Sequence, residues 1–353
     1  KKIYSKSKIQ INRIEIENAN IYFQMKDILD LRNHLYYKIN KPVYIKKSNF
    51  FLIDQNKQTI LISQLKKIKY LIDIKNNFKQ FKINGNIFDV DYISLWKRNY
   101  DNPNETFNEI NTKNPNLDIK NLFLLEGDKK FSGKSTINFL NEKIIINYKF
   151  QDNKILVDTP NENQNIKFVS KIELDPFFFE SKINIDDKDI NFFTDYLFSY
   201  IFNSEKQYFG NMNGNVSLEI SNLKNSLINN GVINFSIEDK SIKLKKSQFE
   251  VQDIGNIESE FWYYINNGDL IFISENMFEL KNRKEFSRKF QISIKKLKNI
   301  NKIYFNLEKN IDNGEISISQ VYINKIDKEK FSEKIFIIKN IQLFKAFIRD
   351  ILS

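Results

Sequence analysis

The sequence contains no cysteine, and His34 is its single histidine among 353 residues. A chain without thiols forms no disulfide framework, no thiolate metal site and no cysteine nucleophile. One histidine likewise argues against a histidine-cluster metal site and against a Ser-His-Asp triad. We therefore expect no catalytic residues, no metal and no cofactor, and we interpret the chain as non-enzymatic.

Long hydrophobic runs are also missing, since no stretch approaches the eighteen or more apolar residues that a membrane-spanning helix needs. The sequence begins with Lys1 rather than Met. We therefore expect it to be part of a longer chain, whose N-terminal anchor helix is missing from this sequence.

The net charge is +11, but only six of the 55 basic residues are arginine. Arginine is favoured in nucleic-acid binding because its planar guanidinium makes bidentate and stacking contacts. The abundance of Lys, Asn, Ile and Phe, all with AT-rich codons, indicates a coding bias rather than selection for a basic surface. We expect no nucleic-acid partner.

Alternation of apolar and polar residues is the main structural signal in the sequence. Such a period of two is typical of half-buried β-strands, and it occurs at residues 215–220, 241–246, 291–295 and 315–319. Five of the nine glycines follow asparagine, as in hairpin turns or glycine bulges. Residues 151–154 and 238–241 are further predicted tight turns. We predict a meander of many strands between about residues 8 and 325.

Three segments instead show helical spacing: residues 27–38, 189–203 and 340–352. Residues 101–116, with two prolines and many asparagines, are a predicted loop and the best internal boundary. The predicted domains are residues 1–110, an N-terminal β-rich part, and residues 117–353, a C-terminal β-rich part that holds the second and third helices. Both parts are expected to form one continuous body.

A long meander with one apolar face must bury that face on itself, against a second sheet or against a ligand. Short apolar and glycine patterns follow one another along the second half of the chain, at residues 171–177, 192–202, 214–220, 230–235, 254–259, 277–280, 290–294 and 340–344, with a similar hairpin at 81–88. In the order of these patterns, residues 164–353 resemble the C-terminal half of AsmA-like proteins.

The resemblance implies an elongated, strongly curved antiparallel sheet, a β-groove, in a periplasmic protein attached to the inner membrane by an N-terminal helix. It implies a role in outer-membrane lipid homeostasis, in which an apolar groove shields the acyl chains of a phospholipid or other acyl lipid during transfer. The predicted groove wall comprises Val216, Leu218, Ile220, Ile233, Phe235, Ile237, Phe261 and Tyr263.

Two further segments are candidates for membrane or head-group contact. One is the apolar stripe of the second predicted helix, with Phe193, Leu197 and Ile201. The other is the basic run 281–302, represented by Lys284, Arg288 and Lys289. Each also has an ordinary structural interpretation, as a helix packed on the sheet or as a solvated lysine-rich face.

The alternative to lipid transfer is a structural or adhesive all-β surface protein with a closed core and no lipid.

One short motif is similar to a nucleotide-binding sequence. Residues 127–136 end like a phosphate-binding loop, but the first two glycines lie six positions apart instead of five. Because alternating residues follow, we predict a hairpin turn there and no nucleotide site.

Overall fold

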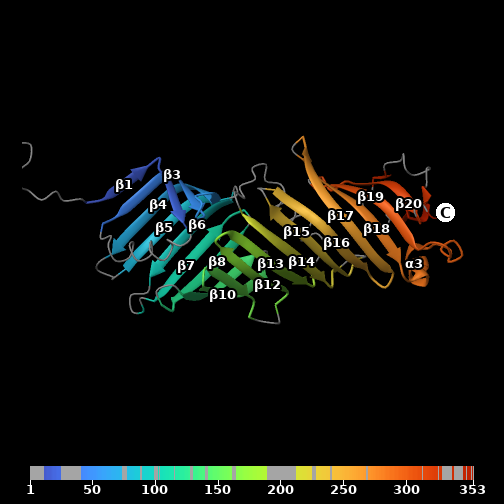
Figure 1. The fold of residues 1–353 in the computed structure, drawn as a ribbon, viewed down its shortest axis with the longest axis horizontal. Coiled ribbons are helices and arrows are strands. Elements are labelled where there is room, and N and C mark those ends of the chain that lie inside the picture. The colour runs from blue at the N-terminus through green and yellow to red at the C-terminus, as the bar shows by residue number, and fades with distance from the viewer. Residues whose placement is uncertain are drawn as a thin grey trace, which may run out of the picture. The chain divides into compact units, whose positions relative to one another are not determined.

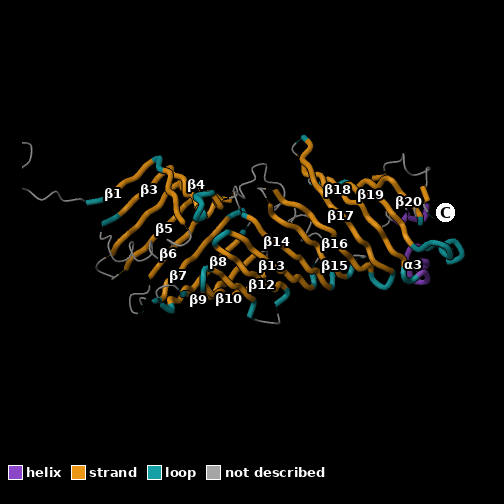
Figure 2. The backbone as a smooth tube through the Cα atoms, viewed as in Figure 1, coloured by secondary structure: helices purple, strands orange, loops and turns teal. Residues whose placement is uncertain are grey.

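The computed structural model is mainly β, with 72% of the described residues in strands and 5% in helices. Figure 2 shows that the described residues lie mostly in strands; among them, helix occurs in α3 (Arg283–Phe290) and in a short segment near the C-terminus. The structure describes residues 12–24, 41–73, 78–87, 90–98, 102, 104–114, 116–127, 130–139, 142–160, 164–188, 212–224, 228–238, 241–267, 269–311, 313–324, 326–327, 336–337, 345–346, 348–350 and 352.

The chain divides into two compact units. Unit 1 comprises Lys1–Glu180 and Lys206–Asn213, and unit 2 comprises Ser181–Glu205 and Gly214–Ser353. The division falls inside strand β13 (Phe177–Asp186). The segment 101–116, predicted to be a loop, instead contains strand β7 (Glu105–Thr112), because its polar residues pair with the strands on both sides.

Unit 1 is a run of strands in which, from β3 to β12, each pairs antiparallel with the next. Figure 1 shows this run of strands as blue to green arrows. The remaining strands of this unit are β1 (Ile14–Glu17), β2 (Asn20–Gln24), β3 (Val43–Ile53), β4 (Thr59–Asp73), β5 (Phe78–Ile87), β6 (Val90–Arg98), β8 (Leu117–Leu125), β9 (Phe131–Phe139), β10 (Glu142–Gln151), β11 (Lys154–Asp158) and β12 (Ile166–Leu174).

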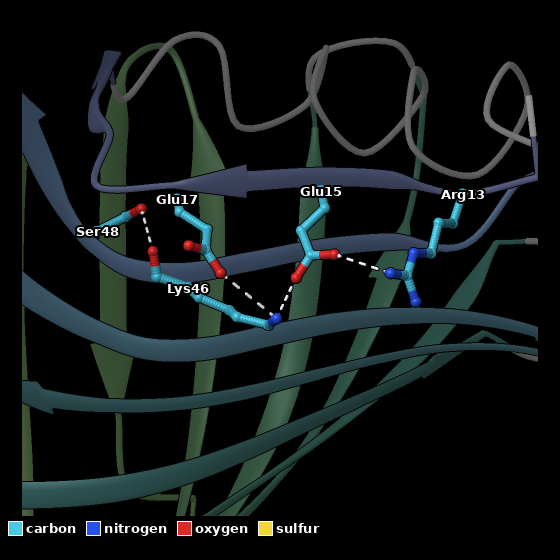
Figure 3. A network of polar contacts seen from close by, with 5 residues as sticks. All are labelled: Arg13, Glu15, Glu17, Lys46 and Ser48. Atoms are coloured by element: carbon cyan, nitrogen blue, oxygen red, sulfur yellow. Dashed lines mark hydrogen bonds and ion pairs between the residues drawn. The ribbon is translucent and has the colours of Figure 1, made fainter.

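Strands β1 and β2 both pair with β3 in parallel, so the sheet is mixed rather than antiparallel throughout. Ala19, in the turn between β1 and β2, is bound to β3: its amide donates to Ser48 Oγ (3.1 Å), and Ser48 Oγ donates to the carbonyl of Lys46 (2.8 Å). Figure 3 shows the ammonium of Lys46 between Glu15 and Glu17. The hydrogen bond between Glu15 and Lys46 lowers the pKa of Glu15 and raises that of Lys46.

Unit 2 contains a second antiparallel run, from β14 to β20. Its strands are β14 (Asn213–Ser221), β15 (Asn230–Glu238), β16 (Ser241–Val251), β17 (Gly255–Asn266), β18 (Asp269–Leu280), β19 (Lys302–Asn310) and β20 (Ile316–Ile323), with β21 (Ile326–Asp327) and β22 (Phe336–Ile337) paired to β20.

Helix α3 (Arg283–Phe290) joins β18 to β19 and covers one end of the unit 2 core. The side chain of Asn282 accepts from the amide of Glu285 (3.2 Å) at the N-terminus of the helix. Phe286 and Phe290 are buried in a cluster with residues of β18, β19 and β20. The residues after α3, predicted to form a strand at 291–295, form turns instead, because Ile292 packs into this cluster rather than into a sheet.

Tight turns follow the residue chemistry closely. Asp152 and Asn153 both have positive φ (51° and 63°) between the paired residues Gln151 and Lys154, as the sequence predicts. Glu238 and Ser241 are paired at the predicted second turn. Residues 127–136 lead into strand β9, which pairs antiparallel with β8, as the predicted hairpin requires. A phosphate-binding loop would instead lead into a helix.

The predicted helices at 27–38 and 189–203 lie outside the described residues. Of the predicted helix 340–352, residues 345–346 and 348–350 are described and are helical. The prediction of a mainly β chain with short helices is confirmed, but the sheet is that of a β-solenoid and not of an open β-groove. The physical reason is visible in unit 2, where the apolar side of the sheet is packed into a buried core.

Candidate functional site

One side of the unit 1 sheet carries apolar side chains over successive strands. Ile119 lies opposite Ile137, which in turn lies opposite Ile144. The neighbouring positions of these strands, such as Lys120 and Lys134, are exposed on the other side. We call the following partly exposed set the unit 1 apolar face: Phe81, Ile83, Trp96, Ile110, Ile119, Phe123, Phe131, Ile137, Ile144, Ile146, Tyr148 and Phe150.

Aromatic rings form a connected cluster on this face. Trp96 and Phe123 are stacked with their ring centroids 5.3 Å apart, and Phe131 and Phe150 are stacked at 4.9 Å. Tyr148 meets Phe123 edge-on at 5.5 Å. Since these rings come from β6, β8, β9 and β10, the cluster crosses several strands. Its partly exposed rings form an apolar surface suited to hydrocarbon.

The position of Tyr148 depends on a glycine in the next strand. A Cβ on Gly133 would lie 2.2 Å from the Tyr148 hydroxyl oxygen and 2.4 Å from the carbonyl oxygen of Leu122, so only glycine fits. The Tyr148 hydroxyl donates to that same carbonyl (3.2 Å). Burial raises the pKa of Tyr148 well above its usual value, so the phenol stays neutral and adds no charge to the face.

A row of polar side chains lies within the apolar face. Asn108 Nδ2 donates to Ser94 Oγ (2.8 Å), and Asn121 Nδ2 donates to Asn108 Oδ1 (2.9 Å). Ser135 Oγ donates to Asn121 Oδ1. Ser94, Asn108 and Ser135 are buried, and because each partner satisfies the next, the row adds hydrogen bonds without leaving these groups unpaired.

A buried basic side chain lies beside this row. Arg98 is opposite Thr106 across β6 and β7, and both are buried. The Thr106 hydroxyl makes no hydrogen bond, and Phe123 lies opposite Thr106 on the other neighbouring strand.

The structure places the predicted groove wall in unit 2 and on one face, as its register requires: Val216 lies opposite Phe235, and Leu218 lies opposite Ile233. That face is closed, however. Leu218 is only 1% exposed, and the other predicted residues of β14 and β15 are also buried. Only Phe261 and Tyr263, on β17, are partly exposed. Six of the eight predicted positions, namely Val216, Leu218, Ile220, Ile233, Phe235 and Ile237, therefore have almost no accessible surface.

Of the predicted membrane contacts, Phe193, Leu197 and Ile201 lie outside the described residues. Lys284 is exposed on α3. Arg288 and Lys289 are engaged within the protein, since the Arg288 guanidinium binds Glu285 (2.6 Å) and the Lys289 ammonium donates to the side chain of Gln252. The pairing with Arg288 lowers the pKa of Glu285.

In the part of the chain that the structure describes, no three His, Cys, Asp or Glu side chains are grouped to hold a metal ion. His34 lies outside that part. None of the helical segments within the described ranges combines the length with the apolar character that crossing a bilayer requires.

Comparison with known proteins gives no assignment, since no protein-family model and no curated protein matches the chain. The features that bear on function are therefore the unit 1 apolar face, the closed face of unit 2 and the basic surface around α3.

Proposed function

We propose that this protein is a non-enzymatic lipid-binding or lipid-transfer protein, and that acyl chains lie along the unit 1 apolar face. One observation carries the proposal: the apolar residues of this face, Phe131 and Ile137 among them, stay partly exposed, whereas the equivalent residues of β14 and β15 are buried. Monomeric proteins rarely leave a contiguous apolar surface uncovered without a ligand or partner for it.

The driving force of such binding is the removal of hydrocarbon from water. Each methylene that leaves water contributes about 0.8 kcal/mol, so a palmitoyl chain contributes on the order of 12 kcal/mol if fully covered. A surface that covers only part of the chain retains a fraction of this energy. Transfer between membranes requires no bond to be made or broken, which fits a protein without nucleophilic thiols.

The cellular setting belongs to the same proposal and rests on the resemblance to AsmA-like proteins. It is a periplasmic protein, attached to the inner membrane by a segment outside this sequence, that carries phospholipid for the outer membrane. In that setting the acyl chains contact the unit 1 apolar face, while the charged head group stays in water.

A structural or adhesive role is the second candidate, and the closed face of unit 2 favours it. A protein whose function is mechanical has no need of an accessible apolar surface, and burial of residues such as Leu218 and Ile233 is what that role predicts. This candidate requires that the purified chain contain no lipid.

The test places charge on the face and compares lipid content. Ile119→Lys/Ile137→Lys puts two ammonium groups at directly opposed positions of β8 and β9. The matched control, Leu156→Lys/Val169→Lys, adds the same charge at positions 51% and 57% exposed on the other side of the sheet. Native mass spectrometry of the full chain reports the bound lipid, and far-UV circular dichroism reports the fold.

We expect the control to retain phospholipid and the face variant to lose it, since burying a charge against hydrocarbon costs several kcal/mol. Ile119→Ser/Ile137→Ser is a milder variant of the same positions in case the lysines prevent folding. Lipid retained in a folded face variant, or lipid absent from the unaltered protein, contradicts the proposal, and the second result supports the structural role.

A further inference from the structure

Helix α3 and the ten residues after it form a compact projection between β18 and β19. We call residues 283–300 the α3 tip. Its apolar side chains Phe286, Phe290, Ile292, Leu297 and Ile300 are buried in the unit 2 core cluster. The rings of Phe286 and Phe290 stack at 4.4 Å. The tip is therefore anchored from beneath by the core.

Hydrogen bonds fix the shape of the turn segment. Ser287 Oγ donates to the carbonyl of Ile292 (2.6 Å), and the amide of Ile292 donates to the carbonyl of Ser287 (3.1 Å). Arg283 Nε donates to the carbonyl of Leu297 (3.1 Å), and the amide of Leu297 donates to the carbonyl of Ile294 (3.1 Å). Residues 292–297 therefore form a constrained loop.

One apolar side chain of this loop points away from the core. Ile294 is 46% exposed, whereas its neighbours Ile292 and Leu297 are buried. An isolated exposed isoleucine is common on protein surfaces and carries no meaning by itself. Here, however, exposed lysines follow it in the same segment, at Lys295 and Lys298.

The charge around Ile294 is strongly positive. The α3 tip contains seven basic residues and a single acidic one, Glu285. The basic residues are Arg283, Lys284, Arg288, Lys289, Lys295, Lys296 and Lys298. Arg288 neutralises Glu285, and Arg283 bonds within the tip. Within the described residues, the ammonium groups of Lys284, Lys295 and Lys298 make no ion pair, so their charge faces solvent.

We propose that the α3 tip is a docking surface for an anionic lipid membrane, with Ile294 entering the interfacial layer and Lys284, Lys295 and Lys298 contacting lipid phosphates. Lysines around one apolar side chain match the interface, where charged head groups overlie acyl chains. A nucleic acid is the less suitable polyanion, since isoleucine offers no ring for base stacking and the solvent-facing cations are lysines.

This inference is independent of the proposed function, because it concerns binding of the α3 tip to a membrane surface and not binding of a single lipid molecule to the unit 1 apolar face. The probe is the full chain cosedimented with vesicles of phosphatidylcholine containing phosphatidylglycerol, and with vesicles of phosphatidylcholine alone. We expect binding only to the anionic vesicles, with an affinity that falls as salt screens the charges.

Two variants test the residues. Lys284→Gln/Lys295→Gln/Lys298→Gln should lower the affinity for anionic vesicles about 100-fold, because each basic residue near an anionic surface contributes to the binding free energy and the variant removes three of them. The matched control Lys120→Gln/Lys134→Gln/Lys149→Gln removes the same charge from exposed positions of unit 1 and should leave the affinity unchanged. Ile294→Ser should lower it roughly tenfold, and Ile294→Leu should restore it.

Three results would overturn the proposal: no binding of the unaltered chain to anionic vesicles, an equal loss in the unit 1 control, or full binding by Ile294→Ser. If Ile294→Ser binds vesicles fully and the unaltered chain binds an oligonucleotide as tightly as it binds the vesicles, the tip is a general polyanion site and not a membrane-docking surface. The unit 1 variant Ile119→Lys/Ile137→Lys should still dock on vesicles, so failure of the proposed function and failure of this inference are distinguishable.

Discussion

Asn108 offers the sharpest test of how the polar row supports the unit 1 apolar face. It is 1% exposed and lies between Ser94 and Asn121, donating to the first (2.8 Å) and accepting from the second (2.9 Å). Asn108→Ala leaves a buried hydroxyl and an amide without this partner and opens a small cavity. A buried polar group that loses its partner costs about 1–3 kcal/mol. We expect unit 1 to lose about 2–4 kcal/mol of unfolding free energy.

The matched control is Asn138→Ala, which removes the same atoms from an exposed asparagine of β9 that bonds Asp118 at 3.1 Å. Its effect should stay within about 0.5 kcal/mol. Unfolding in urea can be followed by tryptophan fluorescence, since the two tryptophans, Trp96 and Trp262, lie in different units. A Trp262→Phe background then reports unit 1 alone.

A second result comes from combining Asn108→Ala with Asn121→Ala. Because the two side chains bond each other, the double variant should be less destabilised than the sum of the single ones, by about 1 kcal/mol. Additive effects, or an Asn108→Ala variant as stable as Asn138→Ala, would refute the reasoning that this row is a connected, buried network.

Three further predictions concern other parts of the chain. Gly255→Ala should destabilise unit 2 by about 1–3 kcal/mol, because its Cβ would lie 2.0 Å from the backbone oxygen of Glu279, and urea unfolding measures this. Lys46 lowers the pKa of Glu15, so the ion pair stabilises the fold above the ordinary carboxyl pKa. This stability is lost as pH falls through the lowered pKa, and Glu15→Gln should flatten that part of a plot of stability against pH. The raised pKa of Tyr148 means that stability falls as pH rises above the ordinary tyrosine pKa. Burial also raises the pKa of Tyr92, so ultraviolet titration should show one late-ionising tyrosine fewer in Tyr148→Phe than in the unaltered protein.

Period-two alternation identified strands wherever a neighbouring strand was available to pair. The runs 215–220, 241–246 and 315–319 lie in β14, β16 and β20. The run 291–295 has the same alternation but forms turns, because β19 occupies the position next to β18 and Ile292 packs with α3 instead. Alternation shows which residues share a face but not whether a partner strand exists.

Openness of the apolar face could not be read from the sequence. Leu218 and Ile233 were expected to line one face, and they lie opposite each other on β14 and β15, yet their burial depends on what the tertiary structure packs against them. Ile119 and Ile137 are also directly opposed aliphatic residues of neighbouring strands, and they remain partly exposed. The three-dimensional arrangement therefore distinguishes a buried core from an accessible surface in these two cases.

The polar row was not predicted, because period-two alternation assigns polar residues to the face opposite the apolar one. A signal was present in the sequence: Ser94 and Asn121 each lie two positions from an aliphatic or aromatic residue on both sides. Asn84-Gly85 lies within β5 and not in a hairpin turn. It stands opposite a register shift between Leu65 and Lys67 of β4, which fits the second interpretation of the Asn-Gly pairs, a bulge within the strands. A Cβ on Gly85 would meet the Tyr92 side chain at 2.8 Å.

Photo-crosslinking with a phospholipid that carries a diazirine on its acyl chain tests whether acyl chains contact the unit 1 apolar face. After irradiation of the full chain, mass spectrometry of the peptides locates the modified residues. We expect adducts on β8 to β10, at side chains such as Phe123, Phe131 and Tyr148, and none on the buried face of β14 and β15. Adducts confined to unit 2, or an absence of specific adducts, would contradict it.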